Sequence, residues 1–384
     1  MAERIQTDTV VVGGGIMGSA TALHLRQLGQ QVVLLERGFV ASQASGASFG
    51  NIRLQGRHLL QLPLAWRSRR IWDRLEELVG TDCEFENCGN LQVSYSDEGM
   101  AALEDYARAA FDYDLEVEML GRNAIRQRFP YLSEEVIGGS WTPQDAIANS
   151  RQVAPAFARA ARHAGARIEE FCEVSELEHD GNHFIVSTKR GLEVRASAVV
   201  NCAGAWGAWI AERFGERAPI SAEGPQLGVT EPMPYFLDTV LAVTGGEYSE
   251  DGKLKPSGAY LRQHPRGNIV FGGGDHSFPS MDPPRSRAIP ETYSRLREPL
   301  SRLVPGLRSA QIIRFWSGIE GYLPDMSPII GPSATTPGLF HAFGFCGHGF
   351  QLGPGVGAVM ADLVAKGATD TPIDAFNISR FGAA

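Results

Sequence analysis

The sequence predicts an α/β fold in which two domains are interleaved along the chain. A strand–helix–strand unit opens the chain at residues 9–35, and apolar runs typical of buried parallel strands recur at residues 198–202 and toward the C-terminus. Residues 221–315 are rich in Pro and Gly and indicate mostly β structure. Because parallel-strand signals appear at both ends of the chain, we expect one domain to be assembled from distant segments.

The opening unit consists of two strands with a helix between them. Residues 9–12 (Thr-Val-Val-Val) form a β-branched apolar run that leads directly into glycines, as a buried strand entering a turn does. Apolar residues at helical spacing over residues 17–28, closed by Gly29, predict a helix. Residues 31–35 predict a second strand, which ends at Glu36. These three elements together predict a βαβ unit.

The later elements are predicted by the same periodicities. Apolar residues at helical spacing indicate a long helix over residues 64–78, and alternation over residues 183–194 indicates a hairpin. The other expected elements are a loop at 41–50, a strand near 90–93, helices at 121–129 and 150–164, a buried strand at 198–202 and a C-terminal helix at 355–366.

Composition excludes several classes of function. The net charge of −9 over 384 residues argues against a nucleic-acid partner, because phosphate binding needs a basic face. No apolar run is long enough for an integral membrane segment, and the N-terminus lacks the pattern of a signal peptide, so we expect a cytoplasmic protein. The five cysteines contain no Cys-x-x-Cys pair, and no metal site is expected.

A glycine motif stands between the first strand and the first helix. Gly13, Gly15 and Gly18 form a G-x-G-x-x-G pattern, which allows a tight turn and close approach of a pyrophosphate to the helix N-terminus. Glu36 closes the second strand, where a carboxylate accepts hydrogen bonds from ribose hydroxyls and disfavours the 2′-phosphate of NADP. The motif predicts a Rossmann-type dinucleotide site but does not distinguish FAD from NAD.

The C-terminal region distinguishes the two cofactors. Residues 344–354 read Gly-Phe-Cys-Gly-His-Gly-Phe-Gln-Leu-Gly-Pro, a Gly-His-Gly turn that leads into a helix. Backbone N–H groups at such a helix start suit the electron-rich O2/N1 edge of a reduced isoalloxazine. The region therefore favours FAD.

With these motifs, the chain resembles the glycine/sarcosine/D-amino-acid oxidase (DAO-type) family of FAD enzymes. The resemblance covers the FAD-binding segments at both ends and residues 200–206 (Val-Asn-Cys-Ala-Gly-Ala-Trp), and within the family it is nearest to opine oxidase flavin subunits and iminodiacetate oxidases. It implies a second, α+β substrate domain built on a mixed sheet. The expected FAD-binding domain comprises residues 1–85, 145–220 and 316–384, and the expected substrate-binding domain comprises residues 86–144 and 221–315.

The resemblance carries the family's cofactor-binding positions over to this sequence. For the phosphate loop, the helix start and the ribose acid with its neighbour, they are Gly13, Gly15, Ile16, Met17, Gly18, Glu36 and Arg37. For the loop along pyrophosphate and flavin, the adenine-pairing backbone and the segment closing over the dinucleotide, they are Ser45, Gly46, Ala47, Ser48, Val174, Ala203, Gly204 and Trp206. For the flavin edge, they are Gly318, Gly347, His348, Gly349, Phe350 and Gln351.

Two positions depart from the family pattern. Relatives with covalent flavin carry a Cys near the position of Gly318, so the FAD is expected to be non-covalent. Glycine oxidase-like relatives carry a carboxylate-binding Arg where Glu320 stands here. Glu320 then either binds a cationic substrate group or pairs with Arg314 or Arg262.

Four residues are expected to contact the substrate. Arg53 directly follows the flavin loop, in the place where sarcosine oxidase-like relatives put an Arg on the ring face; the alternative is a surface salt bridge. Tyr260 and Arg262 share one face of a strand that borders the pocket in the family, although a plain half-buried strand has the same pattern. Glu320 is the fourth, and His276 is expected at the surface.

The resemblance implies FAD-dependent oxidation of the C–N bond of a small secondary amino acid, iminodiacetate-, sarcosine- or opine-like. Hydride transfer to flavin N5 gives an imine, which hydrolyses to a keto acid or glyoxylate plus an amine. In the oxidase alternative, O2 reoxidises the flavin and yields H2O2. In a second alternative, the chain is the flavin subunit of a dehydrogenase that passes electrons to partner subunits. A flavin-binding relay protein without turnover is a third.

Overall fold

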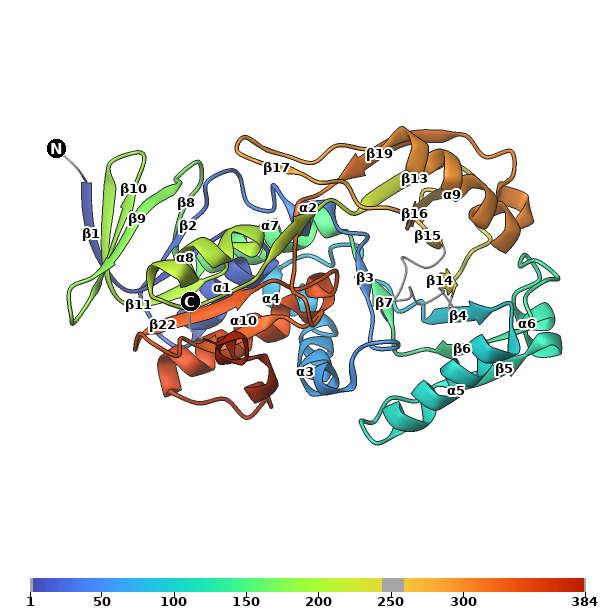
Figure 1. Cartoon of the computed structure of the whole chain (residues 1–384), viewed down its shortest axis with the longest axis horizontal. Coiled ribbons are helices and arrows are strands. Elements are labelled where there is room, and N and C mark those ends of the chain that lie inside the picture. Colours follow the sequence, from blue (N-terminus) through green and yellow to red (C-terminus); the bar gives the residue numbers. More distant parts are fainter. Residues whose placement is uncertain (1–2, 244–258, 383–384) are drawn as a thin grey trace.

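The computed structural model describes residues 3–243 and 259–382. Among these residues, two eight-stranded sheets organise the chain and lie at opposite ends of the molecule (Figure 1). The strands of the first sheet run in the order β21-β22-β11-β1-β2-β8, with β10 and β9 added at β11. Their bounds are β1 Glu3–Val12, β2 Val32–Leu35, β8 Arg167–Glu169, β9 Val174–His179, β10 Phe184–Thr188, β11 Leu192–Asn201, β21 Ile329–Pro332 and β22 Leu339–Phe343.

Both faces of the first sheet are covered. Val11 and Leu34 face a core shared with helices α1 (Ile16–Gln27), α3 (Leu62–Trp72), α7 (Ser150–His163) and α10 (Gly349–Lys366). The alternate residues, Val10 and Leu35 among them, face a second core under β9 and β10. A parallel strand that is buried on both faces needs apolar residues at every position. This explains the uninterrupted Val run of β1, which pairs in parallel with β2 and β11 at the centre of the sheet.

The second sheet is mixed, as expected. Its order is β19-β13-β16-β15-β14-β4-β6-β5, and β14 and β4 pair in parallel while the other neighbours run antiparallel. The bounds are β4 Asn90–Ser94, β5 Glu118–Gly121, β6 Gly138–Thr142, β13 Gln226–Pro232, β14 Val240–Val243, β15 Tyr260–Gln263, β16 Asn268–Gly272 and β19 Ile312–Ser317. The residue boundaries expected for the two domains stay a prediction.

Apart from two long helices, the remaining elements are short. They are the helices α2 Ala44–Ala47, α4 Leu75–Val79, α6 Arg122–Arg128 and α8 Gly207–Arg213, the strands β3 Asn51–Ile52, β7 Ala146–Ile147, β12 Ser221–Glu223, β17 Ser280–Met281, β18 Pro284–Arg285 and β20 Glu320–Tyr322, and 3₁₀ turns at Leu59–Gln61, Gly204–Trp206, Pro305–Leu307, Asp374–Phe376 and Ile378–Phe381. None of the helices in the described ranges is both long and apolar enough to cross a bilayer.

Two long helices were not expected from the sequence. α5 (Asp97–Phe111) is N-capped by the Ser96 hydroxyl, which accepts from the Gly99 N–H at 3.2 Å. α9 (Pro290–Leu303) lies inside the segment expected to be mostly β, and that expectation is wrong there. Leu296, Leu300 and Leu303 form its buried stripe, at a spacing that the surrounding Pro and Gly residues obscured.

Two predicted helices have different bounds in the structure. The helix expected over residues 64–78 is divided into α3 and α4. α10 starts at Gly349, before the expected 355, and continues through Pro354. Its glycines permit close packing: a Cβ at Gly353 would lie 2.7 Å from the Ile16 side chain, and one at Gly357 would lie 2.6 Å from Ala20 Cβ. Packing against α1 therefore outweighs the low helix propensity of this sequence.

Candidate active site

A cavity of about 960 Å³ extends along the carboxyl ends of the first sheet and reaches the second sheet. Val12 and Leu35, which end β1 and β2, line it on one side, and Asn90 of β4 and Tyr260 of β15 line it on the other. This volume lies at the upper end of the usual range for small-molecule and cofactor sites. The placement, at the carboxyl edge of a parallel sheet, is where α/β folds bind dinucleotides.

The glycine turn leaves the N-terminus of α1 open to the cavity. Gly13 has φ +106°, and a Cβ there would lie 2.4 Å from the Cys202 carbonyl oxygen. Gly15 is the N-cap residue and has no side-chain cap, while the Ile16 N–H donates to Ser45 Oγ at 2.9 Å. Such a backbone end attracts anions, so the turn fits a pyrophosphate.

The acid that follows β2 also borders the cavity. Glu36 is 8 % exposed, and its Oε2 and Oε1 accept from the N–H groups of Gly14 and Gly38, each at 2.7 Å. A carboxylate oxygen accepts more than one hydrogen bond, so both oxygens keep capacity for ribose hydroxyls. The guanidinium of Arg37 lies 3.5 Å from the ring centroid of Trp206, next to this acid.

Unsatisfied polar atoms in the cavity wall provide a test of whether the residues fit FAD. Arg37 Nη2, Asn51 Oδ1, His348 Nδ1 and Gln351 Oε1 are buried without a hydrogen-bond partner among the described residues, and all four residues line the cavity. Buried polar atoms are rarely left without partners. A large ligand carrying both donors and acceptors would satisfy them, so these residues fit FAD.

The predicted cofactor positions line the cavity with two exceptions, Gly18 and Gly46. A Cβ at Gly18 would lie 1.9 Å from the Gly13 carbonyl oxygen, and one at Gly46 would lie 2.3 Å from the Ala41 carbonyl oxygen. These two glycines therefore allow the close backbone contacts of the turns that line the cavity, without lining it themselves. Direct contact of each lining residue with FAD stays a prediction.

Two arginines of one loop form a cationic part of the cavity wall. Arg53 lines it, and its Nη1 donates to the carbonyls of Gln55 (3.1 Å) and Gly56 (2.9 Å). Arg57 also lines it and was missed by the sequence analysis; its Nη2 donates to the His348 carbonyl at 3.3 Å. Burial, together with the neighbouring Arg53, lowers the pKa of Arg57 to about 9. Arg57 lies four positions after Arg53 in the same loop, and this spacing was the sequence signal that could have indicated it.

The charge of this arginine pair is only partly balanced. Asp145 holds the backbone next to Arg53, accepting from the Leu54 N–H at 2.7 Å, and it accepts from Asn90 Nδ2 at 3.0 Å. Burial raises the pKa of Asp145 to about 6. Burial and the two arginines hold the pKa of His348 well below its usual value, so this histidine is neutral. A substrate carboxylate would find a positive potential here.

Glu320 and its neighbours form an acidic part of the cavity wall. Tyr322 Oη donates to Glu320 Oε2 at 3.2 Å, and burial raises the pKa of Glu320. Neither Arg314 nor Arg262 forms an ion pair with Glu320 among the described residues. His276, expected at the surface, instead lines the cavity; its Nδ1 lies 2.8 Å from Glu223 Oε2 and its ring centroid lies 5.3 Å from that of Tyr322.

The structure separates the two strand residues expected to contact the substrate. Tyr260 lines the cavity, but Arg262 does not. Arg262 is 7 % exposed, and its Nε donates to the Phe49 carbonyl at 2.9 Å. Its guanidinium therefore supports the backbone of the cavity wall, and this placement does not support a substrate contact.

Comparison with known proteins identifies the family. Residues 8–363 match the family described as DAO, FAD dependent oxidoreductase. The chain is 28% identical to sarcosine oxidase subunit beta of Rhizobium meliloti (97% of this chain, 88% of that protein) and 27% identical to glycine oxidase of Geobacillus kaustophilus (97% of each). The crystal structure of L-proline dehydrogenase from P. horikoshii superposes with a TM-score of 0.89 at 27% identity, covering 98% of both chains.

This match spans most of the sequence and includes both the glycine turn and the Gly-His-Gly turn at the cavity. The glycine/sarcosine/D-amino-acid oxidase resemblance and the FAD cofactor are thereby confirmed. The chain belongs to the DAO family of FAD-dependent oxidoreductases and is an enzyme that acts on amines or amino acids.

Proposed function

We propose that this chain oxidises the C–N bond of a small secondary amino acid of the sarcosine, iminodiacetate or opine type. The observation that carries the proposal is that one cavity contains a positive pole, formed by Arg53 and Arg57, and a negative pole, formed by Glu320 with Tyr322. The residues that fit FAD line the same cavity. An amino acid offers a carboxylate and an amine, which these poles complement. Two similar proteins are named for sarcosine and L-proline, both secondary amino acids.

The arginine pair would bind the substrate carboxylate. Only Nη1 of Arg53 donates to other described residues, which leaves the Nη2 and Nε donors for a ligand. A guanidinium binds both oxygens of a carboxylate in parallel, and this contact strengthens when water is excluded. Arg57 adds positive charge while its own hydrogen bond to the His348 carbonyl joins this pole to the Gly-His-Gly turn.

Glu320 would receive the amine. An α-carbon gives up a hydride only when its amine is neutral, so the ammonium must first lose a proton. The Tyr322 hydroxyl donates to Oε2, and the Glu320 carboxylate is the group assigned to take that proton. Burial, which raises the pKa of Glu320, makes this carboxylate a stronger base than an exposed one. FAD, when bound, supplies the two-electron acceptor for the hydride.

A second role is favoured by one comparison. The similar protein from Rhizobium meliloti is named as a subunit, so this chain would be the flavin subunit of an assembly that passes electrons to partner subunits. Oxygen consumption by the isolated chain separates the two roles. An oxidase consumes O2 and forms H2O2, whereas a dehydrogenase subunit reduces its flavin but consumes O2 slowly.

Anaerobic bleaching of the flavin absorbance tests the substrate class directly. Sarcosine, L-proline, iminodiacetate and an opine are compared with glycine and with dimethylamine, which lacks a carboxylate. We expect bleaching by at least one secondary amino acid and none by dimethylamine. Equal bleaching by dimethylamine, or no bleaching by any secondary amino acid with FAD bound, would reject the proposal.

A further inference from the structure

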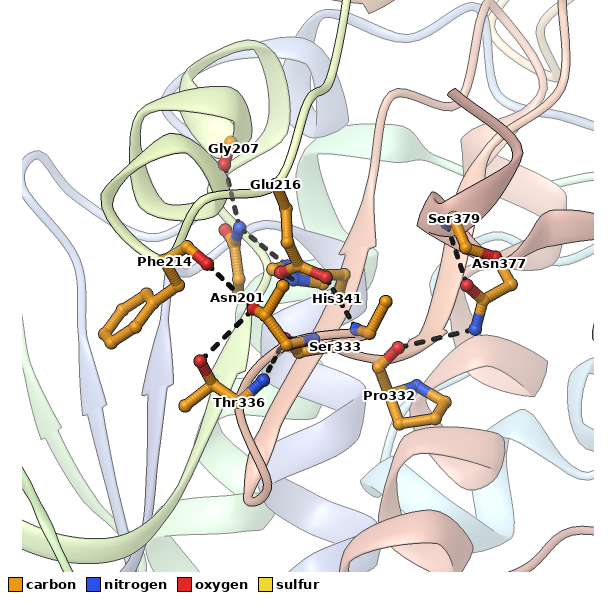
Figure 2. Close-up of polar contacts among 12 residues, drawn as sticks. Asn201, Gly207, Phe214, Glu216, Pro332, Ser333, Thr336, His341, Asn377 and Ser379 are labelled. Atoms are coloured by element: carbon orange, nitrogen blue, oxygen red, sulfur yellow. Dashed lines mark hydrogen bonds and ion pairs between the residues drawn. The ribbon is translucent and has the colours of Figure 1, made fainter. Parts of the chain in front are cut away.

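A buried polar chain lies behind the cofactor turn, away from the substrate poles. His341 of β22 and Glu216, which follows α8, are 0% and 3% exposed, and His341 Nε2 lies 2.7 Å from Glu216 Oε2. On its other side, the His341 ring meets the side chain of Asn201, the last residue of β11 (Figure 2). Asn201 and His341 lie opposite each other in the parallel β11–β22 pair, which brings the two side chains together.

The hydrogen bonds determine where each proton lies. Asn201 Oδ1 accepts from the Ala203 N–H at 3.2 Å, so its amide nitrogen is the atom that faces His341 Nδ1 at 3.2 Å and the Gly207 carbonyl at 2.8 Å. An amide nitrogen only donates, so His341 Nδ1 must accept. The ring proton is then on Nε2 and is donated to Glu216, whose other oxygen accepts from the Ala334 N–H at 2.6 Å.

The amide of Asn201 in turn holds both ends of a cavity-lining turn. Its oxygen binds the N–H of Ala203, and its nitrogen binds the carbonyl of Gly207. Between these two residues lies the 3₁₀ turn Gly204–Trp206, which lines the cavity and places Trp206 against Arg37. The amide must keep one orientation to make both contacts, and the neutral tautomer of His341 favours that orientation.

We propose that Glu216, His341 and Asn201 form a positioning relay that sets the affinity of the chain for FAD. Glu216 selects the tautomer of His341, His341 orients the amide of Asn201, and Asn201 holds the turn that closes over the dinucleotide. The three residues are positioning residues, since none of them lines the cavity. The relay is independent of the substrate class proposed above.

The Glu216→Gln variant should reverse the direction of the hydrogen bonds in the relay, because the side chain keeps almost the same shape but an NH2 group replaces an acceptor oxygen. If the oxygen of the new side-chain amide keeps the Ala334 N–H, the NH2 of that amide faces the Nε2–H of His341, and two donors oppose each other. His341 then shifts its proton to Nδ1, where it opposes the NH2 of Asn201. Turning the Asn201 amide over costs both contacts to the turn. We expect the FAD dissociation constant, measured by flavin fluorescence of serially diluted holoprotein, to rise roughly tenfold.

Variants at residue 341 provide a second test that does not depend on the folding of Glu216→Gln. Gln at 341 offers a donor group (NH2) and an acceptor oxygen, whereas Leu offers neither. We expect His341→Leu to weaken FAD binding roughly tenfold or more and His341→Gln to remain within about threefold of wild type. This rescue distinguishes hydrogen-bond polarity from packing, because Leu and Gln have similar volumes.

Asn377 provides the control, since it contacts the β21–β22 hairpin that carries His341 but lies outside the relay. Its Nδ2 lies 3.5 Å from the Pro332 carbonyl and its Oδ1 accepts from the Ser379 N–H, with no contact to the relay (Figure 2). Asn377→Ala should lower the melting temperature while the FAD dissociation constant stays within about threefold of wild type. If Glu216→Gln and His341→Leu behave like this control, losing stability without loss of FAD affinity, the relay is purely structural and the proposal is overturned.

Discussion

Two arginines four positions apart in one loop share the wall of the cavity, yet their roles differ. Arg57 donates to the His348 carbonyl and to Gln61 Oε1, so part of its fork holds the Gly-His-Gly turn in place. Arg53 uses Nη1 for two loop carbonyls, its other two nitrogens donate to no other described residue, and the residue lines the cavity. At this scale Arg53 is the better candidate for the carboxylate, and Arg57 is the better candidate for supporting the turn.

Substitution of Arg53 tests this assignment. Loss of a bidentate contact in a dry site costs ~2–4 kcal/mol of transition-state binding, so Arg53→Ala should lower kcat/KM roughly thirty- to thousand-fold. Arg53→Lys should be nearly as harmful, because an ammonium keeps the charge without the planar fork. Steady-state kinetics on protein with equal FAD content provides the measurement.

Arg262 is the matched control for this series. It is a buried arginine of the same region, but it binds the Phe49 carbonyl and does not line the cavity. Arg262→Ala should lower the melting temperature and leave kcat/KM within about threefold of wild type once FAD is bound. Equal losses in the Arg53 and Arg262 variants would place the carboxylate elsewhere.

At the scale of elements, Glu216 joins the end of α8 to the loop between β21 and β22. Although burial opposes its ionisation, hydrogen bonds from His341 and the Ala334 N–H hold the pKa of Glu216 below its ordinary value of 4.5. A carboxylate with a depressed pKa in the folded state stabilises that state above its ordinary value. This contribution is lost as the pH falls through the lower, folded-state value.

The pH dependence of unfolding should therefore differ between wild type and Glu216→Gln. Near pH 7 the variant should be less stable by roughly 1–3 kcal/mol, since a buried donor loses its acceptor. Below pH 4.5 the difference should shrink, because protonation of Glu216 removes the same charge from wild type. Melting temperatures between pH 7 and pH 3 provide the test, and a constant difference over this range would show that Glu216 does not titrate with folding.

For the whole molecule, Gly318 bears on how the cofactor is retained. A Cβ at this position would lie 2.7 Å from Ala47 Cβ, so the β19–β20 connection packs closely against α2 and a side chain there would require a local shift. Because no Cys stands there, acid precipitation should release FAD into the supernatant. Yellow colour retained in the denatured pellet would contradict the expected non-covalent attachment.

The cofactor half of the cavity was predictable because its chemistry is local. The glycine turn, Glu36 and the Gly-His-Gly turn each lie within a few residues of the strand or helix that positions them, and apolar periodicity predicted those elements. All but two of the predicted cofactor positions line the cavity, and the exceptions are glycines that permit the turns. The sequence by itself therefore determined the βαβ unit, the α/β fold with a mixed second sheet and the FAD family.

Tertiary structure decided the features that depend on residues far apart in the chain. Glu216 and His341 are separated by 125 positions, and Arg57 and His348 by 291, so no local pattern links them. Local sequence also did not indicate that His276 lines the cavity or that Arg262 donates to the Phe49 carbonyl. α10 began early because its glycines pack against α1. Long-range packing determines which side chains come into contact, whereas periodicity along the chain predicts only local secondary structure.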